Sequence, residues 1–284
     1  MANNTGRLYK SFIILLLLGI FIELGALVSI FRGDDERNGN IAVVEVAGPI
    51  EDSKDTIKRL KKYEDNEKVK AIVVRVNSPG GTVGASQEIH DEILRIKDKK
   101  KIIVSMGDVA ASGGYYLSAP ANKIVANPGT LTGSIGVIAT YFVVDDLLRK
   151  FHLKWEVIQA GKMKDIGSPL RSLTADEKLF LKQLTEDMHN QFIEAVSKGR
   201  NLSIEKTKEL ADGRIFSGKQ AQELGLVDEL GSLEFAIQLA AREVNLKEKP
   251  KAIYPPEEKF GFFKNFSDRT FFRRGLQVLF QQYP

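Results

Sequence analysis

Ser112 is the residue of this chain best placed to act as a nucleophile. It lies in a run of small residues, 108–115 (DVAASGGY), that follows an apolar β-type run at 101–106. In open α/β sheets, sites form beyond the carboxyl ends of strands. A serine at a helix N-terminus there can expose its hydroxyl, while the next amide, that of Gly113, points at a developing oxyanion. A serine that merely caps the helix is the alternative explanation.

Two other segments carry groups that such chemistry needs. Residues 77–81 (NSPGG) directly follow the apolar run 71–76, and paired glycines leave room for a backbone N–H to face a ligand. Taken alone, this segment is better explained as a plain strand-to-helix turn. Residues 160–169 (AGKMKDIGSP) carry Lys162 and Lys164. Lysines in such a loop are usually solvated, whereas a lysine held in an apolar pocket can act as a general base.

A Ser-His-Asp triad is the rival to a lysine base. The chain has three histidines, His90, His152 and His189, and none follows a strand end with turn residues. The G-x-S-x-G pattern of α/β-hydrolases is not matched around Ser112. Because the chain has no cysteine, a thiolate metal site and a cysteine nucleophile are excluded.

The elements that must position these residues alternate between β and helical patterns. Strands are expected at 41–46, 71–76, 101–106, 123–126, 135–139 and 155–159. Helices are expected at 54–63, 83–96, 110–119, 174–198, 203–211, 217–224 and 232–244. The helix at 174–198 has an apolar stripe, expected to face the core, of Leu179, Leu181, Leu184, Met188, Phe192 and Val196. The alternation predicts one α/β domain at 41–248 with a largely parallel sheet.

Composition and charge exclude several classes of protein. The 284 residues are 43% hydrophobic and 27% charged, which excludes a mostly disordered, collagenous or coiled-coil chain. The net charge of +4 arises within 247–284, which contains eight basic and four acidic residues. The rest of the chain is neutral overall, so it lacks the excess of positive charge that is typical of nucleic-acid binding. The basic-aromatic tail at 249–284 can bind lipid headgroups, pack on a neighbouring subunit, fill a substrate groove or stay flexible.

Residues 12–31 (FIILLLLGIFIELGALVSIF) predict a transmembrane signal anchor. Twenty residues at about 1.5 Å each span about 30 Å, the thickness of the hydrocarbon core. Their apolar side chains contribute roughly −4 to −9 kcal/mol, which outweighs about +3 kcal/mol for Glu23. No A-x-A cleavage site lies near the end of the run. The flanking charges favour a single-pass protein of the cell membrane, with 1–11 in the cytoplasm, a linker at 32–40 and the domain outside.

Four segments together resemble the signal peptide peptidase A family, the Ser/Lys peptidases whose fold is shared with the Clp protease proteolytic subunit and the crotonases. These segments are NSPGG, AASGGYYLSAPAN, GTLTGSIGV and KDIGSP, and they occur in the family's order. The likeness covers residues 41–248 and follows a single predicted anchor. It implies a Clp protease/crotonase-like α/β domain with a helical C-terminal arm, and a reaction without metal or cofactor.

The resemblance also implies a role for each site residue. Ser112 would be the nucleophile, Lys164 the general base, and Ser134 the residue that hydrogen-bonds and orients the lysine amine. The oxyanion hole would be built from the amides of glycines: Gly113 with Gly80 or Gly81. Lys162 lies two residues before the assigned base. A free lysine has a pKa near 10.4, so a lysine base at neutral pH needs desolvation that lowers this value by about three units.

The function implied by the resemblance is that of a membrane-anchored serine endopeptidase. Its substrates would be remnant signal peptides and other small or unfolded apolar peptides. The family's long form takes the lysine from one tandem copy and the serine from the other, whereas this chain carries both in one copy. A homo-oligomer is therefore implied, an octameric ring in which Ser112 of one subunit meets Lys164 of the next. A crotonase-like acyl-CoA enzyme and an inactive membrane scaffold are the alternatives.

Overall fold

The computed structural model describes Gly19 and residues 39–254. The strands are β1 (Ile41–Ala47), β2 (Ala71–Ser78), β3 (Lys101–Ala111), β4 (Lys123–Ala126), β5 (Leu131–Gly133), β6 (Ile215–Ser217), β7 (Glu229–Leu230) and β8 (Ala252–Ile253). They form one sheet of order β6-β5-β3-β2-β1-β8, in which β4 pairs with β3 and β7. All pairings among these strands are parallel except that of β5 with β6. The α/β class with a mostly parallel sheet is therefore confirmed.

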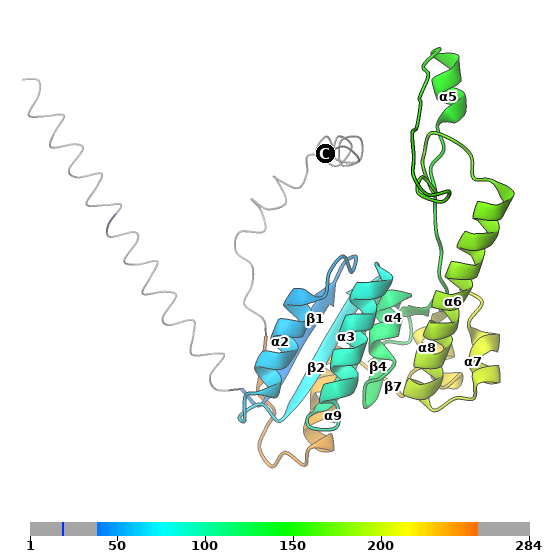
Figure 1. Cartoon of the computed structure of the whole chain (residues 1–284). Helices are drawn as coiled ribbons and strands as arrows, with labels where there is room; N and C mark the ends of the chain where they lie inside the picture. The colour runs from blue at the N-terminus through cyan, green and yellow to red at the C-terminus, as the bar shows by residue number, and fades with distance from the viewer. Residues whose placement is uncertain (1–18, 20–38, 255–284) are drawn as a thin grey trace, which may run out of the picture. The chain divides into compact units, whose positions relative to one another are not determined.

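Helices cover both faces of this sheet (Figure 1). They are α2 (Lys54–Glu64), α3 (Val83–Ile96), α4 (Gly113–Ser118), α5 (Asp145–Lys150), α6 (Ala175–Arg200), α7 (Ile204–Leu210), α8 (Gly218–Glu223) and α9 (Leu233–Glu243). Alternate residues of β1, β2 and β3 pack against α2, α3 and α4, and the intervening ones pack against α9. Burial on both faces explains why the strand at 71–76 reads as a continuous apolar run.

Two predictions at the ends of β3 and β5 need correction. β3 continues through Ala111, so the helix expected at 110–119 begins only at Gly113. The strand expected at 135–139 is wrong, and β5 lies before it at Leu131–Gly133. The reason is local. Gly133 and Ser134 both have positive φ, 77° and 50°, and this turn takes the chain out of the sheet before residue 135.

The strand expected at 155–159 is also wrong. Its β-type side chains Val157 and Ile158 are exposed, at 51% and 103%, and no strand of the described chain pairs with them. An isolated β-type sequence with no neighbouring edge has no partner for its backbone N–H and C=O groups. This segment belongs instead to an arm, which we define as residues 138–184 and which contains α5 and the N-terminal part of α6 (Figure 1).

The apolar stripe of α6 is buried at one end only. Phe192 and Val196 lie in the core, as predicted, whereas Leu179 and Leu184 are 58% and 42% exposed, which corrects the expectation that the whole stripe faces the core. The helix is longer than the body it packs against, so its N-terminal half runs into the arm (Figure 1). The arm therefore presents apolar side chains that this subunit does not cover.

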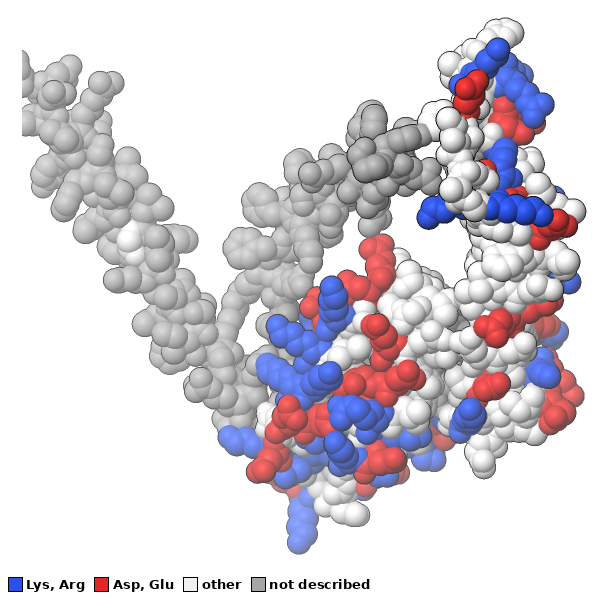
Figure 2. All heavy atoms as spheres, in the orientation of Figure 1, with Lys and Arg blue, Asp and Glu red and all other residues white. Residues whose placement is uncertain are grey.

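The predicted anchor at 12–31 lies outside the described residues, apart from Gly19, as does the tail beyond Tyr254. In the part of the chain that the structure describes, no helix combines the length and hydropathy needed to cross a membrane. On the face that carries α2 and α3, acidic and basic side chains are interspersed, without a large field of one sign (Figure 2).

Candidate active site

Ser112 lies at the turn that joins β3 to α4, at the carboxyl edge of the sheet. Its φ of 52° and ψ of −122° are rare for a residue with a Cβ, and such strain is concentrated at functional sites. The Ser112 amide donates to the Gly133 carbonyl at 2.9 Å, and the Ser112 carbonyl accepts from Tyr115 and Tyr116 amides at 2.9 and 2.8 Å. The hydroxyl does not cap α4, so the simple capping explanation does not apply.

Two amides beside Ser112 have no hydrogen-bond partner among the described residues, those of Gly81 and Gly113. Gly113 opens α4, where a backbone N–H has no acceptor within the helix. The amide of Gly80, in contrast, donates to the Ser78 hydroxyl at 3.1 Å. Paired unsatisfied amides next to a serine are the arrangement that an oxyanion hole requires. The geometry thus favours Gly81 over Gly80 as the second donor.

The glycine turn packs so closely on Ser112 that side chains are excluded. A Cβ on Gly80, whose φ is 97°, would lie 2.6 Å from the Gly113 nitrogen and 2.9 Å from the Ser112 Cβ. A Cβ on Gly113 would overlap the Ser86 hydroxyl. The residues 77–81 are therefore more than a plain turn, because they form one wall of the site around Ser112.

Gly80→Ala is expected to lower the free energy of unfolding by about 1–3 kcal/mol, since alanine is strained at this φ and its Cβ meets backbone. Gly84→Ala is the matched control, because nothing lies within 4 Å of a Cβ at that position of α3. The control should be neutral, or more stable by up to about 1 kcal/mol. Urea unfolding of both variants measures the difference, and equal stabilities would contradict the close packing.

A small open pocket adjoins Ser112 and Gly113. Its wall is mostly apolar and includes Val83, Tyr116, Val137, Met188 and Phe192. The Tyr116 and Phe192 rings pack at 4.8 Å between centroids, which fixes the inner wall. Largely uncharged surface lies between α3 and α6 (Figure 2). An apolar pocket beside a nucleophile can hold one apolar side chain of an extended peptide.

Ser134 lies near the same edge, directly after β5. Its amide donates to the Arg214 carbonyl at 2.8 Å, and the preceding carbonyl, of Gly133, accepts from the Ser112 amide. Gly133 therefore connects the two predicted serines, since its carbonyl binds the Ser112 amide and Ser134 is the next residue in the chain. The sequence predictions for Ser112, Ser134 and the three glycines fall on one region of the molecule.

Lys164 is not part of this region within one chain. It lies in the arm, its side chain is exposed, and it has no hydrogen bond or ion pair with a side chain among the described residues. The residues that line the pocket at Ser112 do not include it. The neighbouring Lys162 forms an exposed ion pair with Asp176 at 3.6 Å.

The histidines do not supply a triad within the described chain. His90 Nδ1 lies 2.8 Å from the Asp91 carboxylate, and its ring packs on Tyr116 at 5.0 Å. His152 is exposed in the arm, and His189 does not line the pocket. Across Gly19 and residues 39–254, no cluster of three His, Cys, Asp or Glu side chains is arranged to hold a metal ion.

Sequence reasoning missed the pocket wall and the contacts of residues 160–169, which carry Lys162 and Lys164 and which we call the lysine loop. Met188 and Phe192 are spaced i, i+4 and so share a helix face, but the sequence does not show that this face meets α4. Arg171 and Glu177, which hold the lysine loop, were also missed. The pattern Thr174-x-x-Glu177 is a capping-box signal that points to Glu177.

The sequence of this chain is similar to two protein families and to several known proteins. Residues 95–247 match peptidase family S49, and residues 40–129 match Clp protease. A Synechocystis protein named as an inferred protease is 47% identical over 203 residues, which is 71% of this chain and 73% of that one. An Enterococcus faecium protein named as an inferred signal peptide peptidase is 39% identical over 189 residues, 66% and 55% of the two chains. A chloroplast serine protease of Arabidopsis thaliana is 34% identical over 226 residues, 79% and 32%.

Proposed function

The chain belongs to peptidase family S49 and is a serine peptidase, and from this premise we propose a membrane-anchored endopeptidase with a Ser112–Lys164 dyad. Its substrates are remnant signal peptides and other small or unfolded apolar peptides, and it uses no cofactor. One observation carries the proposal. The Ser112 hydroxyl makes no hydrogen bond among the described residues and lies at a strained turn beside two unpaired amides.

The reaction proceeds through an acyl-enzyme. Ser112 Oγ attacks the peptide carbonyl carbon while the neutral amine of Lys164 accepts the hydroxyl proton, and Ser134 orients that amine. The oxyanion accepts hydrogen bonds from the Gly113 and Gly81 amides. When the C–N bond breaks, the lysine returns the proton to the leaving amine. Water, deprotonated by the same lysine, then hydrolyses the ester and restores the hydroxyl.

Two subunits complete each dyad. Lys164 is exposed in the arm and does not line the pocket beside Ser112, which supports a dyad in which a second copy brings the amine to the hydroxyl. The arm carries apolar side chains that favour such an assembly: Ile138, Phe142, Val143, Leu147, Phe151 and Ile158. A head-to-tail contact closes into a ring when the rotation between neighbours closes, and the resemblance to the signal peptide peptidase A family favours a ring of eight.

The ring stands on the outer side of the cell membrane. The support is the apolar sequence 12–31, with Arg7 and Lys10 before it and Asp34, Asp35 and Glu36 after it. A protein in this position meets apolar segments released from the bilayer. The pocket beside Ser112 suits such segments because its wall is apolar.

Val137→Trp is expected to slow cleavage after large apolar residues by about 10–200-fold relative to cleavage after alanine, because the indole fills the pocket. The measurement is kcat/KM for two peptide series that differ only before the scissile bond. Leu94→Trp is the control, since Leu94 is an exposed residue of α3 that does not line the pocket. Equal losses for both peptide series would assign the pocket another role.

A fluorophosphonate probe tests the reaction class. We expect covalent labelling of the wild type on Ser112, detected by peptide mass spectrometry, and protection by an apolar peptide. A crotonase-like enzyme would instead bind acyl-CoA, and an inactive scaffold would bind peptides without being labelled. Absence of labelling in the assembled protein would contradict the proposal.

A further inference from the structure

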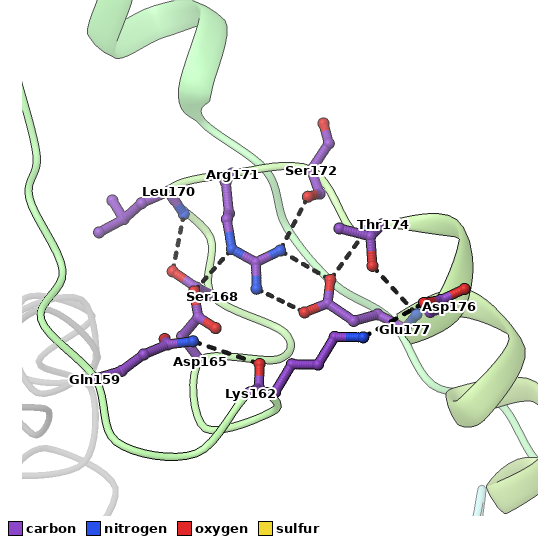
Figure 3. A network of polar contacts seen from close by, with 10 residues as sticks. All are labelled: Gln159, Lys162, Asp165, Ser168, Leu170, Arg171, Ser172, Thr174, Asp176 and Glu177. Atoms are coloured by element: carbon purple, nitrogen blue, oxygen red, sulfur yellow. Dashed lines mark hydrogen bonds and ion pairs between the residues drawn. The ribbon is translucent and has the colours of Figure 1, made fainter.

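Arg171 joins the lysine loop to the start of α6 (Figure 3). Its Nε donates to the Asp165 carboxylate at 2.7 Å. Its other two nitrogens donate to the two Glu177 oxygens at 2.8 and 2.7 Å. A planar guanidinium with a bidentate partner fixes orientation as well as distance, which a lysine cannot do. Asp165 directly follows Lys164, so this contact acts on the backbone next to the proposed base.

Glu177 is itself held by the helix. Its carboxylate accepts from the Thr174 amide at 2.9 Å, and the Thr174 hydroxyl accepts from the Glu177 amide at 3.3 Å, which is a reciprocal capping box. Hydrogen bonds from the Arg171 guanidinium, the larger cause, and from the Thr174 amide lower the pKa of Glu177 to about 2. The stabilisation is complete above the ordinary value of 4.5 and is lost as pH falls toward 2, so it persists at neutral pH.

The rest of the loop is a succession of turns that pack against other residues of the arm. The Lys164 amide donates to the Gly161 carbonyl at 3.0 Å, and the Val144 amide donates to the Pro169 carbonyl at 2.7 Å. Gly167, with φ 81°, lies so close to the Tyr141 ring that a Cβ there would come within 2.6 Å. Both side chains of the Lys162–Asp176 ion pair are exposed, so this pair contributes little to holding the loop on α6. Arg171 thus forms the shorter and less exposed charged link between the loop and α6.

We propose that Arg171 is a positioning residue, which holds the Lys164 loop on α6 so that the lysine amine meets Ser112 of the neighbouring subunit in one geometry. The inference rests on the proposed function. Arg171 acts through Asp165 and the backbone, and its guanidinium is engaged by carboxylates of its own chain. Its loss should therefore impair the chemical step and leave peptide binding in the pocket unchanged.

Arg171→Met is expected to lower kcat by about 10²-fold with KM unchanged, because a displacement of about 1 Å in a reacting group has an effect of this size. Arg171→Lys should recover little of it, since an ammonium cannot bind two carboxylates in a planar fork. The matched control is Arg95→Met. Arg95 also bridges two carboxylates, those of Glu64 and Glu92, but lies on α3 and outside the pocket lining. The control should retain the wild-type kcat.

Subunit mixing gives a readout that a general loss of stability would not produce. Arg171→Met chains supply an intact Ser112 and should regain activity when mixed with Ser112→Ala chains, which supply an intact lysine loop. Mixed with Lys164→Met chains, they should show no gain, because neither chain then supplies a well-placed lysine. Wild-type kcat for Arg171→Met, or a gain with Lys164→Met, would overturn the inference. Full activity of Lys164→Met itself would instead refute the proposed dyad, so the two failures are distinguishable.

Discussion

Ser112→Ala is expected to lower kcat/KM for peptide hydrolysis by on the order of 10⁴–10⁶-fold, because it removes the atom that attacks the peptide carbonyl. Covalent labelling by a fluorophosphonate should disappear with it. The Ser112 hydroxyl makes no hydrogen bond among the described residues, so the free energy of unfolding should change by less than about 0.5 kcal/mol. Peptide kinetics and urea unfolding on the same preparation measure both quantities.

Ser112→Gly separates chemistry from backbone strain. It should be as inactive as the alanine variant but about 1 kcal/mol more stable, because glycine tolerates a φ of 52° that strains other residues. Activity of Ser112→Ala within tenfold of wild type would place the nucleophile elsewhere. A glycine variant less stable than the alanine variant would show that the turn is not strained.

Lys164→Met is expected to reduce kcat by about 10⁴-fold or more, since a serine without its base behaves nearly like a missing serine. The activity should return in trans. In a ring mixed 1:1 from Ser112→Ala and Lys164→Met chains, half of the serines are intact and half of those face an intact lysine. The mixture should therefore reach about a quarter of the wild-type rate.

Lys162→Met is the control, because this neighbouring lysine only forms an exposed ion pair with Asp176. It should keep activity within about twofold, as surface pairs contribute little. Two affinity tags on the two chains verify that mixed rings form. Mixed rings without activity would mean that each dyad is built within one chain, and loss of activity in Lys162→Met would move the base to that residue.

The strands around Ser112 were predictable because each apolar run is buried on both faces and ends in glycine-rich turns. Short-range signals also located helices well, as at Val83–Ile96, whose bounds match the prediction. The arm was not predictable. The β-type residues 155–159 and the outer half of the α6 stripe are apolar, yet they face away from this subunit's core, so a rule that assigns apolar residues to one chain's interior fails there.

Part of the candidate site was also predictable from the sequence, because the order of strands and turns determines which residues meet. Ser112 and the glycines are neighbours because parallel strands end at one edge, which topology alone requires. The choice between Gly80 and Gly81 depends on which amide the Ser78 hydroxyl occupies, and spacing cannot show that. Arg171 was missed because its carboxylates lie six residues away on either side, beyond the usual helical pair spacings.

The pairing of β1 with β8 brings the two ends of the domain together. The Asn40 amide donates to the Lys251 carbonyl at 3.0 Å, and the Asn40 side-chain oxygen accepts from the Lys251 amide at 2.8 Å. The segments before residue 39 and after residue 254 therefore start from neighbouring points on one sheet edge.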